Sequence, residues 1–281
     1  MTNPDFDHLL LQAIQSSFIA GKAIMKVYGE DRLIVKIKKD FSPLTIADQA
    51  AHDVLMKLLE KTQIPVISEE GLQYDYSVRS NWELFWLVDP LDGTKEFLRR
   101  NGEFTVNIAL IKNNLPQIGV VYAPVTGSLY FGSPGLGAYL FSTNAFKNEI
   151  PLDLSQLIQL SEKMPFRKNK INFTIIASRS HRNFETQNYI RKMKKEHSRV
   201  EIISKGSSLK FCLVAEGNAD IYPRFGPTME WDTAAGQAIA ALSGCSVTRY
   251  DTGDILTYNK KELRNPWFIV KRNHPVRGGS R

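Results

Sequence analysis

Cysteine, clustered histidine and long apolar runs are scarce in this chain of 281 residues, and each absence excludes a class of protein. The two cysteines, Cys212 and Cys245, lack metal-site spacing and are too few for a disulfide framework, so we expect a protein of the reducing cytoplasm. No stretch approaches roughly 18 apolar residues, and the start, MTNPDFDHLL, has no basic segment ahead of an apolar one. We therefore expect neither a transmembrane helix nor a signal peptide.

The histidines form no cluster that would suit zinc. They are scattered along the chain at His8, His52, His181, His197 and His274. The net charge is +7, with basic clusters at 167–170 and 191–195. A solvated face is the plain interpretation of this charge, and a site for an anionic substrate is the alternative. No recognisable nucleic-acid motif accompanies the positive charge, so we expect no nucleic-acid partner. The sequence leaves open whether the protein makes peripheral contact with the inner membrane.

The composition, 43% hydrophobic with 10% aromatic residues, allows a full core in one large domain or two ordinary ones. Apolar residues from Leu10 to Met25 recur at helical spacing, and SPLTIADQAAHDVLMKLLEK predicts a second helix over 42–61. Short apolar runs separated by turn residues then predict an antiparallel meander. These runs lie at 65–68, 84–89, 104–111, 116–124 and 127–140.

The second half of the chain has a different pattern. The segment 151–172 is polar, basic and irregular, and beyond it predicted strands alternate with predicted helices up to WFIV at 267–270. Such alternation is typical of an α/β unit. We therefore predict an N-terminal α+β domain over 1–150 and a smaller C-terminal α/β domain over 151–281.

One acidic motif stands out, WLVDPLDGTKEF, in which two aspartates lie close together at the end of an apolar strand. Pro90 fixes its own φ, and Gly93 permits a tight turn or the close approach of a ligand. Two carboxylates held this close repel each other unless a cation lies between them. The structural alternative is an aspartate-rich turn in which Asp92 or Thr94 caps a helix.

Other acids follow the ends of predicted elements. Glu69 and Glu70 end the short strand in PVISEEG, where the plain interpretation of Glu69 is a loop carboxylate. Asp232 opens the helix in EWDTAAGQA, where an N-cap is the plain interpretation. Together with Asp89 and Asp92 they form a set of hard oxygen ligands of the kind that Mg²⁺ prefers. Asp48 has two interpretations as well, because Thr45 and Asp48 fit a capping box, while the alternative is a carboxylate that accepts a proton through a hydroxyl.

These motifs, in this order and at these separations, resemble the Mg²⁺-dependent, lithium-sensitive phosphatase superfamily that includes inositol monophosphatase and fructose-1,6-bisphosphatase. The motifs are SPLTIAD, SEE, DPLDGTKEF, GEFTVNIALI and EWDTAAGQA, and the resemblance covers roughly residues 5–270. Lys95 and Glu96 after DGT, with the last two motifs, resemble the bacterial bisphosphate-nucleotidase branch. The resemblance implies an α/β (α+β) fold, a layered αβαβα sandwich with the site between the two domains.

The resemblance also implies the roles of the site residues. Metal ligands, for about two or three Mg²⁺ ions, are implied at Glu69, Asp89, the Leu91 carbonyl, Asp92 and Asp232. Thr94 and Asp48 would orient and deprotonate the attacking water. Substrate contacts are implied at the metal-site residues Glu69, Leu91, Asp92 and Asp232, at Gly93 and Thr94, and, for a second phosphate, at His181, Ser207, Lys210 and Arg224. The plain alternatives are that Lys210 is a solvated helix residue and that Arg224 pairs with Glu216 or Asp220.

The implied activity is removal of the 3′-phosphate from adenosine 3′,5′-bisphosphate, giving AMP and phosphate. The same 3′-phosphate occurs in 3′-phosphoadenosine 5′-phosphosulfate, so the sequence leaves the cellular substrate open, as it does the choice between monomer and homodimer. The alternatives are a sibling phosphatase for inositol monophosphate or fructose bisphosphate, and a nucleotide sensor without turnover. A sensor is disfavoured because no acid of the set is missing and Thr94 is present.

Overall fold

The structure is a computed structural model that describes residues 5–30, 35–37, 43–147, 149–166, 172–177 and 183–273. Its helices are α1 (Phe6–Tyr28), α2 (Ile46–Leu59), α3 (Tyr76–Arg79), α4 (Thr94–Leu98), α5 (Leu154–Gln159), α6 (Phe184–Glu196), α7 (Leu209–Ala215) and α8 (Ala234–Leu242). Among these helices, none has both the length and the apolar character needed to cross a bilayer.

Two sheets organise the chain. The larger has seven strands in the order β3-β4-β5-β6-β7-β8-β9, namely β3 (Val66–Ser68), β4 (Leu84–Asp92), β5 (Thr105–Lys112), β6 (Leu115–Ala123), β7 (Ser128–Ser133), β8 (Gly137–Ser142) and β9 (Glu162–Lys163). The smaller has five in the order β11-β10-β12-β14-β13, namely β10 (Phe173–Ala177), β11 (Val200–Ser204), β12 (Ile221–Arg224), β13 (Cys245–Arg249) and β14 (Phe268–Arg272). A short antiparallel pair, β1 (Val35–Ile37) and β2 (Pro43–Thr45), precedes α2.

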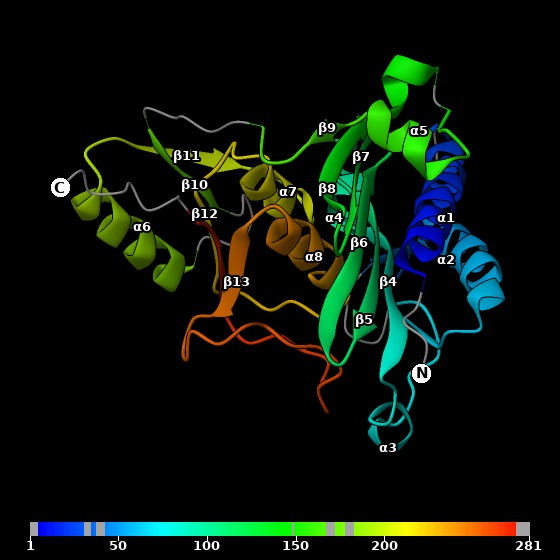
Figure 1. The fold of residues 1–281 in the computed structure, drawn as a ribbon. Coiled ribbons are helices and arrows are strands. Elements are labelled where there is room, and N and C mark those ends of the chain that lie inside the picture. The colour runs from blue at the N-terminus through cyan, green and yellow to red at the C-terminus, as the bar shows by residue number, and fades with distance from the viewer. Residues whose placement is uncertain are drawn as a thin grey trace.

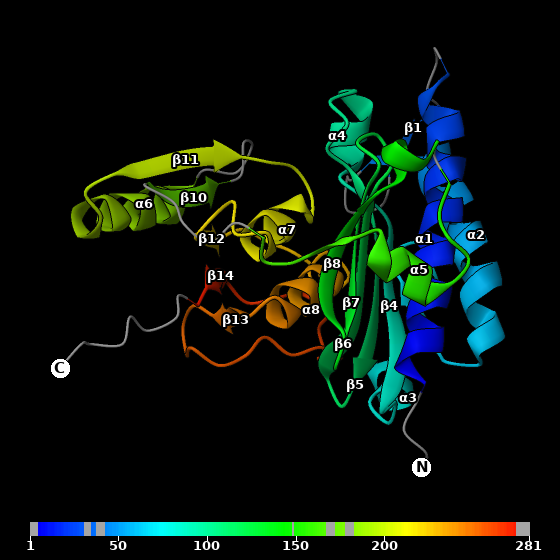
Figure 2. The same cartoon turned by 45° about the horizontal axis from the view of Figure 1, so that its top comes forward.

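The helices and sheets alternate in layers. Helices α1 and α2 cover one face of the larger sheet, α7 and α8 lie between the two sheets, and α6 covers the outer face of the smaller sheet (Figures 1 and 2). This is the predicted αβαβα sandwich, and it is confirmed. One apolar cluster lies under α1 and α2, and a second lies between the sheets around α7 and α8.

Helix α8 lies unusually close to the larger sheet. A Cβ placed on Gly119 of β6 would come within 2.5 Å of the Ala235 carbonyl oxygen and 2.7 Å of the Ala238 Cβ. Only a glycine permits this approach, because any side chain would push the helix away. The contact fixes α8, and with it the preceding segment that carries Asp232, against the sheet that carries the other acids.

Several predicted elements differ in the structure. Pro43–Thr45 forms β2 rather than the start of α2, which begins at Ile46 with Thr45 as its N-cap. The larger sheet is mixed, because β3 pairs with β4 in parallel. The segment expected to be irregular contains α5 and β9, and β9 pairs with β8 of the larger sheet, whereas β13 was not predicted at all. The division at residue 150 stays a prediction.

The two basic clusters have different outcomes. Residues 167–170 lie outside the described part of the chain. The cluster 191–195 lies on α6, where its arginine and lysines are exposed and only Met193 is buried. The plain interpretation, a solvated face, therefore holds for that second cluster.

Candidate active site

The motif around Asp89 and Asp92 forms the end of β4 and the turn into α4. Pairing of β4 with β5 shifts between Asp89 and Asp92, and this irregularity bends the strand end. The Asp89 Oδ1 atom accepts a hydrogen bond from the Leu91 N–H at 3.1 Å. Gly93 follows with φ 97° and is the N-cap of α4, without a side-chain cap. The interpretation of Asp92 or Thr94 as a capping residue is therefore wrong.

Three acids from distant parts of the sequence converge at this strand end. Carboxylate oxygens of Glu69, Asp89 and Asp232 all lie within 4.8 Å of one another. Glu69 directly follows β3, and its N–H donates to the Val88 carbonyl at 3.1 Å, which places it beside β4. The Asp232 Oδ2 atom accepts from the Met229 N–H at 2.9 Å, and Thr233 is the N-cap of α8. The plain interpretation of Asp232 as the N-cap is therefore also wrong.

The electrostatics of this cluster suit a divalent cation. Burial raises the pKa of Asp89 well above its usual range, and the neighbouring Glu69 and Asp92 raise it further. Burial, and then the charge of Asp92, raises the pKa of Asp232 to about 8. The raised pKa of each aspartate means that its ionised form has too little positive charge nearby to stabilise it. Oxygen donors held this close, and unfavourable when ionised, fit a bound Mg²⁺ ion.

The contacts of Asp48 are compatible with both interpretations considered for it. Its Oδ2 atom accepts from the Thr45 N–H at 2.7 Å and from the Thr45 hydroxyl at 2.5 Å, so the capping box is present. Its Oδ1 atom accepts from the Thr94 hydroxyl at 3.1 Å. The cap therefore holds the carboxylate in place, with one oxygen directed at Thr94.

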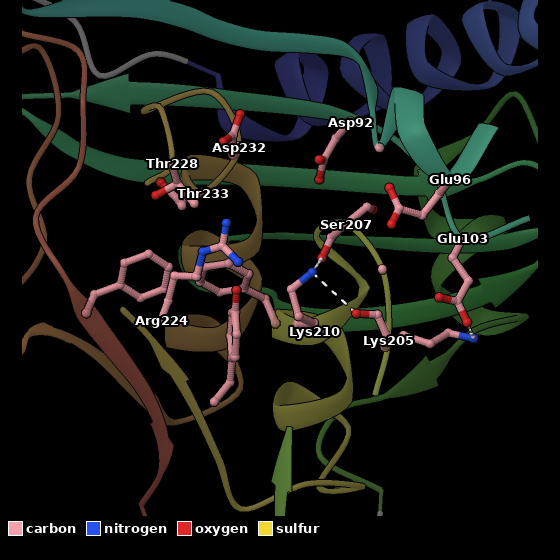
Figure 3. A pocket seen from close by; sticks show the side chains of 15 residues that line it. Asp92, Glu96, Glu103, Lys205, Ser207, Lys210, Arg224, Thr228, Asp232 and Thr233 are labelled. Carbon is pink, nitrogen blue, oxygen red and sulfur yellow. Dashed lines mark hydrogen bonds and ion pairs between the residues drawn. The ribbon is translucent and has the colours of Figure 1, made fainter. Parts of the chain in front are cut away.

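A cavity of about 170 Å³ lies beside these acids. Its walls include the predicted residues Asp92, Gly93, Ser207, Lys210, Arg224 and Asp232. Figure 3 shows Asp92 and Asp232 on one side, with Lys210 and Arg224 on the opposite side. Carboxylates and cations thus face one shared space, which suits a ligand that carries phosphate groups and is held partly through metal ions.

The structure contradicts the plain interpretations of Lys210 and Arg224, which were a solvated helix residue and an ion pair with Glu216 or Asp220. Lys210 is buried, not solvated, and its ammonium donates to the Ser207 carbonyl at 2.6 Å. Burial lowers the pKa of Lys210 to about 8, with the charge of Arg224 lowering it further and that of Asp92 raising it. Arg224 donates to the Pro227 carbonyl at 2.9 Å, and no ion pair joins it to Glu216 or Asp220 among the described residues. His181 lies outside the described part of the chain.

Sequence reasoning missed several residues of the site. Glu96, Glu103 and Lys205 also line the cavity, and Lys205 forms an ion pair of 3.4 Å with Glu103. Asn107 and Ser208 contact Asp92 directly. A signal for Asn107 was present in the sequence, because it is a polar residue within the apolar run of β5.

The chain belongs to the inositol monophosphatase family, whose model matches residues 5–275. It is similar to the 3′(2′),5′-bisphosphate nucleotidase CysQ of Escherichia coli strain K12, with 46% identity over 93% of this chain and 99% of that protein. The CysQ nucleotidase of Haemophilus influenzae is 32% identical, over 94% of this chain and 93% of that protein. The family resemblance seen in the motifs is confirmed.

A solved structure agrees with these matches. The crystal structure of CysQ from Bacteroides thetaiotaomicron, described as a bacterial member of the inositol monophosphatase family, is 49% identical. It superposes with a TM-score of 0.87 and covers 95% of this chain and 98% of that one. The likeness thus extends over both sheets.

Proposed function

We propose that this protein is a Mg²⁺-dependent phosphomonoesterase that removes the 3′-phosphate of adenosine 3′,5′-bisphosphate. The observation that carries the proposal is one cavity lined by Asp92 and Asp232 on one side and by Lys210 and Arg224 on the other (Figure 3). Asp232 also belongs to the acidic cluster with Glu69 and Asp89, and the Thr94–Asp48 hydrogen bond lies next to Gly93 of the cavity wall. A substrate with two phosphates matches both sides. Relatives that are 46% identical over most of the chain are named as nucleotidases for such bisphosphates.

The acidic side would hold the metal. Its ligands are Glu69, Asp89, Asp92, Asp232 and the Leu91 carbonyl. When bound, Mg²⁺ lowers the pKa of a coordinated water and stabilises negative charge on the leaving oxygen. About two or three ions per site stay the expected number.

Thr94 and Asp48 would handle the proton of the attacking water. The Thr94 hydroxyl donates its hydrogen to Asp48 Oδ1, so the lone pairs of Thr94 Oγ1 are available to accept a hydrogen from the water. As the water attacks phosphorus, the bond between phosphorus and the 3′-oxygen breaks, and its electron pair stays on the 3′-oxygen of the departing AMP. The proton of the water passes to Thr94 Oγ1 and the threonine proton passes to Asp48 Oδ1. The Thr45 cap keeps the other oxygen of Asp48 occupied, which prevents the carboxylate from rotating away.

The remaining contacts would bind and orient the substrate. The backbone N–H groups of Gly93 and Thr94 would contact the reacting phosphate. Ser207, Lys210 and Arg224, with His181, would contact the second phosphate. Phosphoryl transfer depends chiefly on positioning and charge neutralisation, and this arrangement supplies both.

Phosphate release from three substrates tests the proposal. Adenosine 3′,5′-bisphosphate, inositol 1-phosphate and fructose 1,6-bisphosphate are assayed side by side with Mg²⁺ and with EDTA. We expect a strong preference for the nucleotide and no release in EDTA. Preference for the inositol or sugar phosphate would assign the chain to a sibling activity of the same family. Tight nucleotide binding without release would identify a sensor.

A matched assay with 3′-phosphoadenosine 5′-phosphosulfate then ranks the two nucleotides that share the 3′-phosphate. The cytoplasm as location, and a monomer or homodimer as the assembly, stay predictions. Inhibition by millimolar Li⁺ is expected from the family resemblance.

A further inference from the structure

Asn107 is a buried amide on β5, only 1% exposed, within an otherwise apolar strand. A buried amide is costly unless its donors and acceptor are bonded. Its Nδ2 group donates to Asp92 Oδ2 at 3.2 Å and to Ser208 Oγ at 2.9 Å. Its Oδ1 atom accepts from the Thr105 hydroxyl at 2.9 Å. Every polar atom of this side chain is therefore used, and one partner is an acid of the candidate metal site.

The hydrogen bonds around Asn107 run in one direction. Thr105 gives its only hydroxyl hydrogen to Asn107, so in the 2.7 Å contact between the Thr105 and Ser207 hydroxyls the donor is Ser207. An ionised Asp92 only accepts, so the nitrogen end of the amide must face it. Ser207 therefore donates to Thr105, Thr105 to Asn107, and Asn107 to Asp92. The order of donors fixes the amide in a single orientation.

Ser208 completes the arrangement from the other side of the site. Its backbone N–H donates to Asp92 Oδ2 at 2.7 Å, and its hydroxyl donates to the Asp232 carbonyl at 2.8 Å. Asp92 Oδ2 thus accepts two hydrogen bonds, whereas Asp92 Oδ1 accepts none that involves a described residue. Because β5 lies in the larger sheet and Ser208 immediately precedes α7, the contacts join two layers of the fold at this carboxylate.

We propose that Asn107, oriented by Thr105 and assisted by Ser208, is a positioning residue that holds Asp92 Oδ2 and leaves Oδ1 available to a divalent cation. This inference rests on the proposed function, because it takes Asp92 as a metal ligand. Groups that orient metal ligands commonly change metal affinity by about 10- to 100-fold when they are removed. A purely structural Asn107 would change stability alone.

The test measures Mn²⁺ and Mg²⁺ affinity of the metal-free, full-length protein by titration calorimetry, alongside its melting temperature in EDTA. Asn107→Ala is expected to weaken Mn²⁺ binding by roughly tenfold. Thr105→Val, which keeps the shape and removes the hydroxyl, is expected to show part of that loss, and Thr105→Ser is expected to restore it. Thr174→Val, at a buried threonine of β10 in the smaller sheet, is the matched control and should leave metal affinity unchanged.

Activity gives a second readout. In Asn107→Ala, excess Mg²⁺ should recover most of kcat, with KM for the nucleotide unchanged. If Asp92→Asn weakens metal binding while Asn107→Ala and Thr105→Val bind metal as the natural protein does, the positioning role is overturned and the proposed function stands. If Asp92→Asn leaves metal affinity intact, Asp92 is not a metal ligand, and both the positioning role of Asn107 and the proposed function are overturned. If Asn107→Ala does not fold, the comparison of Thr105→Val with Thr105→Ser still decides the positioning role.

Discussion

The acidic and basic sides of the cavity are built in different ways. The acidic side of the cavity is formed by Asp92 and Asp232. Asp92 shares one short motif at the end of β4 with Asp89 and Thr94, and Glu69 follows the adjacent strand β3. On the basic side, Lys210 lies on α7 and Arg224 on β12, at separate places on the smaller sheet and its covering helix. The first side is set mainly by neighbouring strands, and the second by how a distant layer packs.

The two sides share one physical property. Burial raises the pKa of Asp89 and of Asp232, and burial lowers the pKa of Lys210. Each side thus holds charges that are unfavourable on their own and become favourable when a ligand brings the opposite charge. We expect metal to supply it on the acidic side and a substrate phosphate on the basic side, so substitutions should separate reaction from recognition.

The largest expected effect comes from the acidic side. Asp92→Asn should lower kcat by about 10³-fold, because removing a ligand of a catalytic metal loses several kcal/mol of charge stabilisation. Steady-state assays with the nucleotide measure this effect. Asp251→Asn, at an exposed residue paired with Arg249, is the control, and its kcat should be nearly the same as that of the natural protein. Retained activity in Asp92→Asn would count heavily against the proposed reaction.

A smaller and more selective effect is expected on the basic side. Lys210→Met should reduce kcat/KM for adenosine 3′,5′-bisphosphate by about 10²-fold, since a charged hydrogen bond to phosphate contributes about 1.5–3 kcal/mol. Adenosine 3′-monophosphate lacks the second phosphate, so kcat/KM for this substrate should fall far less in the same variant. Lys205→Met, in the same cavity but already paired with Glu103, is the matched control. Equal losses for both substrates would remove the distinction between the two sides.

The preference for the bisphosphate over the 3′-monophosphate should change with pH as Lys210 loses its proton. Its pKa is lowered to about 8, so the ammonium loses its proton as the pH rises through that value. Because only the protonated form attracts phosphate, kcat/KM for the bisphosphate, relative to the 3′-monophosphate, should be full below pH 8 and fall by up to tenfold per unit above it. Lys210→Arg, which keeps its charge, should flatten the profile. A ratio independent of pH between 7 and 10 would contradict the assignment.

The smallest effect is expected in stability. In EDTA, Asp89→Asn should raise the melting temperature by a few degrees, because it removes a buried negative charge from among other carboxylates. The asparagine Oδ1 can still accept from the Leu91 N–H. Calorimetry with and without Mg²⁺ measures the change, and stabilisation by Mg²⁺ should be lost in the variant. A lower melting temperature in EDTA would show that the acidic cluster is not under electrostatic strain.

Short-range features of the fold were predictable, and long-range ones were not. The helical period of α1, the capping box at Thr45 and Asp48, and the apolar run of β4 each depend on neighbours within a few residues. The strand β13, the parallel pairing of β3 with β4 and the addition of β9 to the larger sheet depend on partners remote in sequence. Pairing energy between such partners leaves no local pattern, so a single sequence does not reveal it.

The sequence alone determined the types of chemical group in the candidate site. The sequence indicated a site for a hard cation through the carboxylates in DPLDGT, those that follow PVIS and the one that precedes TAAGQA. Carboxylates held close together repel each other without a cation, and this repulsion can be recognised without knowledge of the fold. Only the tertiary structure decided which atoms meet. The close packing of α8 on Gly119 carries Asp232 to the end of β4, and Asn107 and Ser208, from two different layers, meet at one oxygen of Asp92. Such contacts depend on the burial and distance of groups far apart in the chain, and these quantities exist only after folding.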